Sequence, residues 1–128
     1  MPKIVVFVDD SKTVLMTAEL AVKPLVESGD IEIVTYDEAM NFLSDVEKGF
    51  TFDLLITDVN MPKINGLDMA KQIKNNPRLK LKPILALTTE NSQKMKMLGK
   101  QIGLTGWITK PFSPTTLVKA IKRVLRIR

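Results

Sequence analysis

Short hydrophobic runs recur along the chain at a steady interval, and segments with helical spacing separate them. The runs lie at residues 4–8, 31–34, 54–56, 84–87 and 107–108. Three of them are nearly continuous rather than alternating, which is typical of parallel strands that are covered on both faces. The pattern therefore predicts five strands in one parallel sheet.

Each run is followed by a segment whose apolar residues return every three or four positions, as on one face of a helix. In chain order these stripes are Val14, Ala18, Ala21, Val22 and Leu25; Ala39, Leu43 and Val46; Leu67, Ala70 and Ile73; Met95, Leu98 and Ile102; and Leu117, Ile121, Val124 and Leu125. Asn65, either Asn91 or Ser92, and Ser113 before Pro114 are suitable N-caps for the last three helices. Five repeats of strand and helix predict an α/β fold, in which helices cover both faces of an open parallel sheet and the crossovers are right-handed.

The length and composition indicate one ordinary globular domain. The chain has 128 residues, of which 45% are hydrophobic, and it contains no cysteine and no histidine. No repeat or linker interrupts it, so we expect a single domain over residues 1–128. Disulfides, histidine triads and a phosphohistidine carried by this chain are excluded. No apolar run is long enough for a membrane span, and acidic residues come too early for a signal peptide, so we expect a cytoplasmic protein that does not bind membranes.

Charge is unevenly distributed along the chain. Residues 1–58 contain 4 basic and 12 acidic side chains, whereas residues 59–128 contain 15 basic and 2 acidic ones. This asymmetry favours an acidic partner or nucleic acid, and a solvated basic face explains it equally well. Only one Trp and one Tyr are present, and no nucleic-acid-binding motif accompanies the basic residues, so we expect no binding to nucleic acid. Salt-sensitive binding to random duplex DNA would revive that alternative.

Polar side chains stand at the ends of four of the expected strands. Asp9 and Asp10 follow the first strand, Asp58 the third, Thr88 the fourth and Lys110 the fifth. In an open α/β sheet the carboxyl ends of the strands form the ligand site, so these residues should converge there. Three neighbouring carboxylates repel one another, which Mg²⁺ relieves while leaving coordination positions for phosphate oxygens. With the compact charge of Lys110, the set predicts phosphoryl transfer to one carboxylate as nucleophile.

These motifs resemble those of the response-regulator receiver family over the whole chain. The matching stretches are Asp9-Asp10, the segment Asp-Val-Asn-Met-Pro-Lys-Ile-Asn-Gly at 58–66, Thr88, and Lys110-Pro111-Phe112, in the family's order and spacing. Each is a moderate signal by itself, and the four together are highly specific. The resemblance implies a flavodoxin-like (βα)5 fold, with a doubly wound five-stranded parallel sheet in the strand order 2-1-3-4-5.

The resemblance also implies a role for each matching residue of the site. Asp58 is the implied phosphoacceptor and Asp10 a direct Mg²⁺ ligand, while Asp9 acts on the metal largely through water. Asp58 and the backbone carbonyl of Asn60 complete the implied metal site. Lys110 would pair with the phosphoryl group, and its peptide bond to the following proline is expected to be cis.

A second set of implied roles concerns the switch. Thr88, rather than Thr89, has the right spacing to Lys110 for the switch hydroxyl. Trp107 occupies the family's switch-aromatic position, where Tyr or Phe is usual, and Thr89 replaces a smaller residue. Because the indole is larger and lacks a phenolic hydroxyl, simple edge packing of Trp107 remains an equal alternative to switching.

The expected function is that of a stand-alone response regulator in a two-component phosphorelay, and chemotaxis is one of the pathways that the resemblance allows. A sensor histidine kinase would phosphorylate Asp58 with Mg²⁺, and phosphorylation would change the affinity for a downstream protein. We expect a monomer, and no enzymatic activity beyond its own phosphorylation and dephosphorylation. The basic residues predict that the target presents an acidic segment to the fourth and fifth helices. Two alternatives remain open: a receiver fragment of a larger regulator, and a pseudo-receiver that signals without phosphate.

Overall fold

Five strands and five helices alternate along the chain in the computed structural model, which describes residues 1–128. The elements are β1 (Lys3–Val8), α1 (Lys12–Glu27), β2 (Ile31–Tyr36), α2 (Ala39–Glu47), β3 (Leu54–Thr57), α3 (Gly66–Lys74), β4 (Ile84–Thr88), α4 (Gln93–Ile102), β5 (Gly106–Thr109) and α5 (Pro114–Leu125). Each strand extends its hydrophobic run by no more than two residues at either end. The hydrophobic pattern therefore located every strand.

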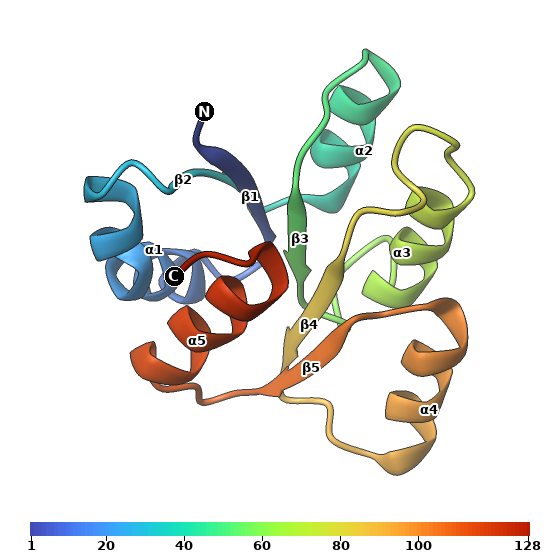
Figure 1. Cartoon of the computed structure of the whole chain (residues 1–128). Coiled ribbons are helices and arrows are strands. Elements are labelled where there is room, and N and C mark those ends of the chain that lie inside the picture. The colour runs from blue at the N-terminus through green and yellow to red at the C-terminus, as the bar shows by residue number, and fades with distance from the viewer.

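The strands form one parallel sheet in the order β2-β1-β3-β4-β5 (Figure 1). This order confirms the doubly wound, flavodoxin-like arrangement. The register pairs Val8 of β1 with Thr57 of β3, and Thr88 of β4 with Thr109 of β5. As a result, the residues that follow β1, β3, β4 and β5 emerge side by side at one edge of the sheet.

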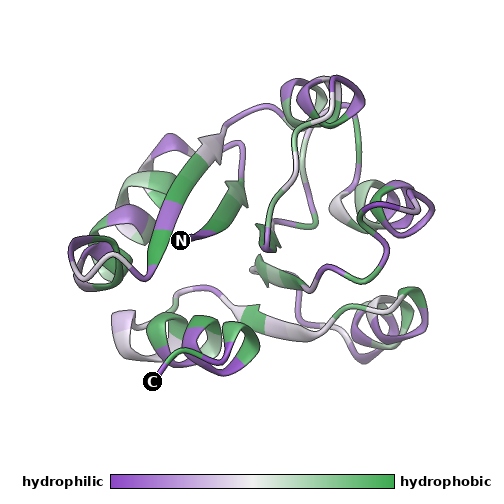
Figure 2. Cartoon of the chain, turned by 45° about the horizontal axis from the view of Figure 1, so that its top comes forward, coloured by the Kyte–Doolittle hydropathy of each residue, from purple (hydrophilic) through white to green (hydrophobic).

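Helices cover both faces of the sheet. α1 and α5 pack on one face against Val5 and Phe7, whereas α2 and α3 pack on the other face against Val6 and Val8. α4 completes the second face through a smaller cluster around Val59. The helices turn their hydrophobic sides to the sheet and their polar sides outward (Figure 2). Because consecutive strand residues are buried on opposite faces, the runs read as continuous rather than alternating.

Side-chain caps start four of the five helices. Asn65 accepts from the Leu67 N–H at 2.7 Å and Ser113 accepts from the Thr116 N–H at 3.0 Å, as predicted. Of the two candidates for α4, Ser92 is the cap. Ser11 caps α1 by accepting from the Val14 N–H at 3.2 Å. The side chains of the preceding aspartates are therefore not needed as the cap of this helix.

The predicted stripe of α4 needs one correction. Leu98 was expected on the buried face, but it is 39% exposed, and the one buried residue of the helix is Gly99. Met95, Gly99 and Ile102 form the inner face, because their spacing of four and three residues follows one side of a helix. Leu98 lies beside this stripe.

None of the helices combines the length and the hydrophobicity that a membrane crossing requires.

Candidate functional site

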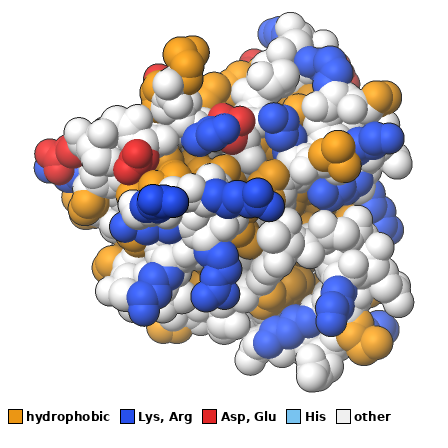
Figure 3. Space-filling model, viewed as in Figure 1, with side chains coloured by type: hydrophobic (Ala, Val, Ile, Leu, Met, Phe, Trp, Pro, Cys, Tyr) orange, Lys and Arg blue, Asp and Glu red, His pale blue; other side chains and the backbone are white.

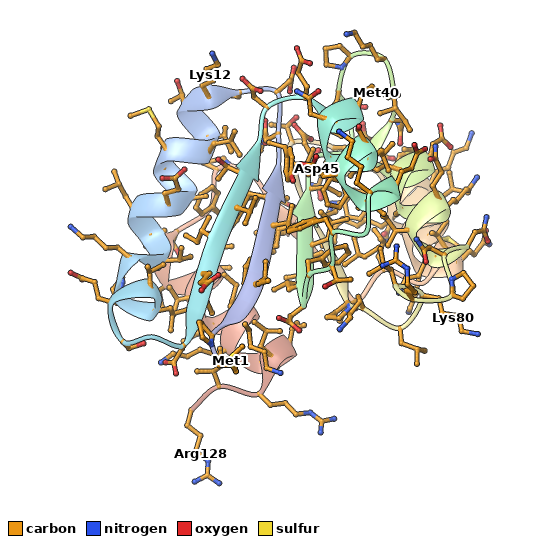
Figure 4. The ribbon with its side chains drawn as sticks, turned by 90° about the horizontal axis from the view of Figure 1, so that it is seen from above. Met1, Lys12, Met40, Asp45, Lys80 and Arg128 are labelled. Carbon is orange, nitrogen blue, oxygen red and sulfur yellow. The ribbon has the colours of Figure 1, made fainter.

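Three carboxylates meet where β1 and β3 end. Asp9 and Asp58 are 3% and 8% exposed, whereas Asp10 lies at the surface. One oxygen atom from each of the three lies within 4.8 Å of the others. In Figure 4, β1 runs from the end near Met1 toward the edge where Lys12 lies, and Asp9 and Asp10 come between β1 and Lys12 in the sequence. The convergence predicted from the strand ends is present.

Lys110 lies between the two buried acids. Its Nζ donates to Asp9 Oδ2 at 2.6 Å and to Asp58 Oδ2 at 3.0 Å. Burial raises the pKa of Asp9, and the hydrogen bond from Lys110 offsets only part of this effect. Burial lowers the pKa of Lys110, but its bonds to both acids outweigh burial and raise the pKa above the ordinary value. Lys110 is therefore held as an ammonium group at the floor of the site.

The backbone after β3 folds tightly around Asp58. Asp58 Oδ1 accepts from the Val59 N–H at 2.7 Å, and the Gly66 N–H donates to the Val59 carbonyl at 2.7 Å. A Cβ atom on Gly66 would lie 1.9 Å from the Asp58 carbonyl oxygen, so only glycine fits. Lys63 lies in the loop between Asp58 and Gly66. Its φ of 70° is a backbone angle that residues other than glycine rarely adopt. This loop fixes where the Asp58 carboxylate points.

The charges of the cluster suit a divalent cation. Three carboxylates and the single ammonium group of Lys110 leave two negative charges without a partner at this edge. Oxygen ligands of this kind are those that Mg²⁺ prefers, usually with one or two carboxylates and several waters. Asp9, Asp10 and Asp58 could therefore hold such an ion. The Asn60 residue, expected to contribute its backbone carbonyl, lies exposed two residues after Asp58.

Thr88 lies at the end of β4 and is completely buried. Its Oγ1 accepts from the Glu90 N–H at 3.2 Å, and its carbonyl accepts from the Lys110 N–H at 2.8 Å. None of the hydrogen bonds in the structure uses the hydroxyl's own hydrogen. Thr88 thus has a donor available, whereas Thr89 is exposed. The peptide bond between Lys110 and Pro111 is cis, as the resemblance implied.

Trp107 lies behind the site rather than in the acidic cluster. Its Nε1 donates to the Glu90 carbonyl at 2.9 Å, and its ring packs with Met95, Ile102 and Leu104 against a buried cluster around Ala86. The indole is half-buried in this inward position. The bulk of Thr89 does not prevent it, because that side chain is exposed.

Glu90 is a connecting residue that the sequence reasoning missed. Its N–H donates to Thr88, its carbonyl accepts from Trp107, and its Oε2 accepts from Asn60 Nδ2 at 3.4 Å. Two of these three contacts use the backbone, which leaves no side-chain signature. The sequence feature that could have identified Glu90 is its position: it lies two residues after Thr88 and is the last acidic residue in the basic half of the sequence.

Basic side chains dominate the part of the surface that α4 and α5 form. In Figure 3 Lys and Arg side chains appear in both halves of the molecule, whereas the visible acidic side chains lie in the upper half and none is seen in the lower half, where these helices lie. The basic residues of the two helices are Lys94, Lys96, Lys100, Lys119, Lys122 and Arg123. None of them forms an ion pair with an acid. Their charge is available to a partner.

Curated relatives resemble this chain over nearly its whole length. It is 30% identical over 118 residues to the chemotaxis protein CheY1 of Helicobacter pylori, an alignment that covers 92% of this chain and 93% of that one. It is 29% identical to PhoP of Bacillus subtilis, an alkaline phosphatase synthesis transcriptional regulatory protein, over 98% of this chain but 50% of the other.

A solved structure gives the same picture. The chemotaxis response regulator CheY4 of Vibrio cholerae superimposes with a TM-score of 0.85 at 36% identity, over 97% of this chain and 99% of the other. The family model described as the response regulator receiver domain matches residues 5–122. Sheet order, site geometry and these matches agree, and the chain belongs to the response regulator receiver domain family.

Proposed function

We propose that residues 1–128 act as one receiver unit that accepts a phosphoryl group on Asp58 from a phosphohistidine of a sensor kinase. The observation that supports this role best is the geometry at the end of β3. The Asp58 carboxylate lies at the ligand edge of the sheet, with Lys110 Nζ 3.0 Å away and two further carboxylates beside it. An acid placed only for stability would not be expected beside two other acids, because like charges destabilise one another.

The chemistry follows from the groups present. A carboxylate oxygen of Asp58 forms a bond to phosphorus while the bond between phosphorus and the donor imidazole nitrogen breaks. The electron pair of the broken bond stays on the imidazole, which takes a proton from solvent. Lys110 then pairs with the new phosphoryl oxygens, and Thr88 donates its free hydrogen to one of them. The protein's own chemistry is proposed to go no further than the formation and hydrolysis of this acyl phosphate.

Mg²⁺ would be held by Asp9, Asp10, Asp58 and the Asn60 carbonyl. When bound, it neutralises the carboxylates and the incoming phosphoryl oxygens. The chain's own contribution is to hold these ligands on two neighbouring strands, and to keep Lys110 charged beside them.

The proposed output is a change in the affinity of α4, β5 and α5 for a target protein. Thr88 and Trp107 both form a hydrogen bond with Glu90. A movement of Thr88 toward a phosphoryl oxygen would therefore be transmitted to the indole through Glu90. A hydrogen bond to a charged group contributes about 1.5–3 kcal/mol, while a complete shift from 1:99 to 99:1 requires about 5.5 kcal/mol. Phosphorylation should therefore activate only partly, and an acidic segment of the target would complete the change by binding the basic helices. Chemotaxis is one setting, because relatives with that name match.

Intact-mass analysis after incubation with acetyl phosphate tests the proposal. Wild-type protein with Mg²⁺ should gain the mass of one phosphoryl group, and excess chelator should prevent the gain. Asp58→Asn should abolish it, and Asp10→Ala should reduce it sharply. Asp68→Asn is the matched control, because Asp68 is an exposed acid on α3 outside the cluster. A wild-type protein that binds Mg²⁺ but gains no mass would be a pseudo-receiver, and the proposal would fail.

A further inference from the structure

Gly99 occupies a position in α4 where nothing in the backbone requires glycine. It is the seventh of ten residues in a regular helix, and glycine is a poorer helix former than alanine at such a position. Gly99 is also the only buried residue of α4. The packing beneath the helix is therefore the place to look for a reason for glycine at this position.

The indole of Trp107 lies directly beneath Gly99. A Cβ atom on Gly99 would lie 3.1 Å from Cζ3 and 3.4 Å from Cε3 of the indole, and 2.9 Å from Leu104 Cδ1. The leucine contact involves the end of a flexible side chain, which can rotate away. The indole is rigid, and its other edge is held by the hydrogen bond from Nε1 to the Glu90 carbonyl. To accept a Cβ atom, the ring would have to shift by a few tenths of an ångström, and the hydrogen bond from Nε1 opposes that shift.

We propose that Gly99 is a positioning residue whose missing side chain allows the large indole of Trp107 to lie inward and bind the Glu90 carbonyl. Gly99 and Trp107 thus form a matched pair: a larger aromatic residue on β5 requires the smallest residue on α4. This pairing explains how an indole, which is larger than the usual Tyr or Phe side chain, can lie inward at position 107. Its signalling consequence rests on the proposed function, but the pairing itself does not.

The surface beside the ring gives the pairing a consequence for binding. A hollow of about 200 Å³ lies next to Trp107, lined on α4 by Lys96, Gly99 and Lys100 and on the β5 side by residues 104–107. With the ring inward, this hollow is open between two lysines of the basic surface. A ring displaced by a side chain at position 99 would change the shape of this hollow, because Gly99 and Trp107 both line it. Gly99 therefore affects the shape of the surface that the target is proposed to bind.

Tryptophan fluorescence tests the pairing directly, because Trp107 is the only tryptophan. Gly99→Ala should shift the emission to longer wavelength and increase quenching by iodide, since the ring moves toward water. Lys94→Ala, which alters an exposed position of α4 outside the lining of this hollow, is the control and should leave the emission unchanged. Wild-type emission and quenching in folded Gly99→Ala would overturn the proposal.

A double-mutant comparison tests the proposal even if Gly99→Ala folds poorly. In the wild-type background the substitution should lower the denaturation midpoint. In a Trp107→Leu background it should raise the midpoint, because the ring is gone and alanine favours the helix. A loss of stability in both backgrounds would show that Leu104 or the helix packing, not the indole, requires glycine. If the proposed function is wrong, wild-type protein will not be labelled on Asp58 by acetyl phosphate. The emission and stability measurements do not depend on that labelling, so the two failures can be told apart.

Discussion

At the scale of single residues, Lys110 is the group that balances negative charge at the strand ends. It reaches two buried carboxylates at once, at 2.6 and 3.0 Å. Asp10 is outside this arrangement: it is exposed and has no hydrogen bond or ion pair with Lys110. Asp10 therefore adds repulsion to the cluster without a compensating contact. We therefore expect that the carboxylate of Asp10 binds a ligand.

Asp10→Asn should accordingly stabilise the metal-free protein while weakening its binding of Mg²⁺. Removing one exposed like charge is worth up to about 1 kcal/mol. Chemical denaturation in the presence of chelator measures the gain, and titration of Trp107 fluorescence with Mg²⁺ measures the loss. Asp68→Asn should leave Mg²⁺ binding unchanged and should not raise stability, because Asp68 lies in the first turn of α3 and pairs with Lys71 at 3.9 Å. A destabilised Asp10→Asn protein with unaltered Mg²⁺ binding would contradict the assignment of Asp10 as a ligand.

Tyr36 provides a pH-dependent contribution to stability that is separate from the site. Its burial, together with the 2.7 Å hydrogen bond that its hydroxyl donates to Asp45 Oδ2, raises its pKa from 10.0 to about 12. The unfolded chain loses this proton first, so stability should fall as the pH rises from about 10 to about 12. Tyr36 is the only tyrosine, so tyrosinate absorbance reports its titration directly. Asp45→Asn should lower the midpoint, and a wild-type midpoint near 10 would refute the prediction.

Side-chain chemistry explains which site residues could be predicted from the sequence. Asp9, Asp10, Asp58, Thr88 and Lys110 carry charges or a hydroxyl at strand ends, so their type and position pointed to the site before any geometry was known. Glu90 and Gly99 escaped prediction for physical reasons. Glu90 acts mainly through backbone groups, and the role of Gly99 depends on a ring that approaches it from another element.

At the scale of elements, the loop between β3 and α3 positions Asp58 through close backbone contact. Gly66 begins α3 and lies against the carbonyl of Asp58, so strand end and helix start are in direct contact. The helix cap was predictable from Asn65, because caps have a local signature. The close approach was not, since it depends on how the helix returns to the strand.

Gly66→Ala should therefore destabilise the protein by about 3 kcal/mol, at the upper end for overpacking of a well-packed site, because the backbone of Asp58 must move. Phosphorylation of Asp58 should slow with it. Gly29→Ala is the comparison: no atom lies within 4 Å of its added Cβ, so only its φ of +84° opposes the change. That substitution should cost about 1 kcal/mol and leave phosphorylation unchanged. Similar losses of stability in the two variants, measured by chemical denaturation, would refute the close-contact account.

At the scale of the whole molecule, the burial of the strands on both faces of the sheet made their positions in the sequence predictable. It did not make predictable which strands lie next to each other. Nearly continuous apolar runs identify central strands, yet such runs look alike and do not encode which strands pair. The order β2-β1-β3-β4-β5 was implied by the family resemblance rather than by the runs. Surface charge behaves in the opposite way: the basic half of the sequence was evident, but only the fold shows that α4 and α5 are neighbours across β5 (Figure 1).

Reversing the charge of Lys119 and Lys122 to Glu should slow association with a glutamate-rich peptide and flatten its salt dependence. Electrostatic steering by such a surface changes association rates by roughly tenfold or more at low salt. Stopped-flow measurement of the rate at several salt concentrations gives both quantities. The matched control reverses Lys71 and Lys80, which changes the net charge equally on another part of the surface. Equal effects of the two double substitutions would show that only the net charge matters. The basic residues of α4 and α5 would then be an ordinary solvated surface and not a binding site.

The central claim is that Asp58 receives a phosphoryl group in a Mg²⁺-dependent reaction. Tandem mass spectrometry of wild-type protein treated with acetyl phosphate tests it most directly, because fragment ions locate the modified residue. We expect one phosphoryl group, on Asp58, in the presence of Mg²⁺, and none when excess chelator is present. Labelling at a different residue, or equal labelling of Asp58 with and without Mg²⁺, would contradict it.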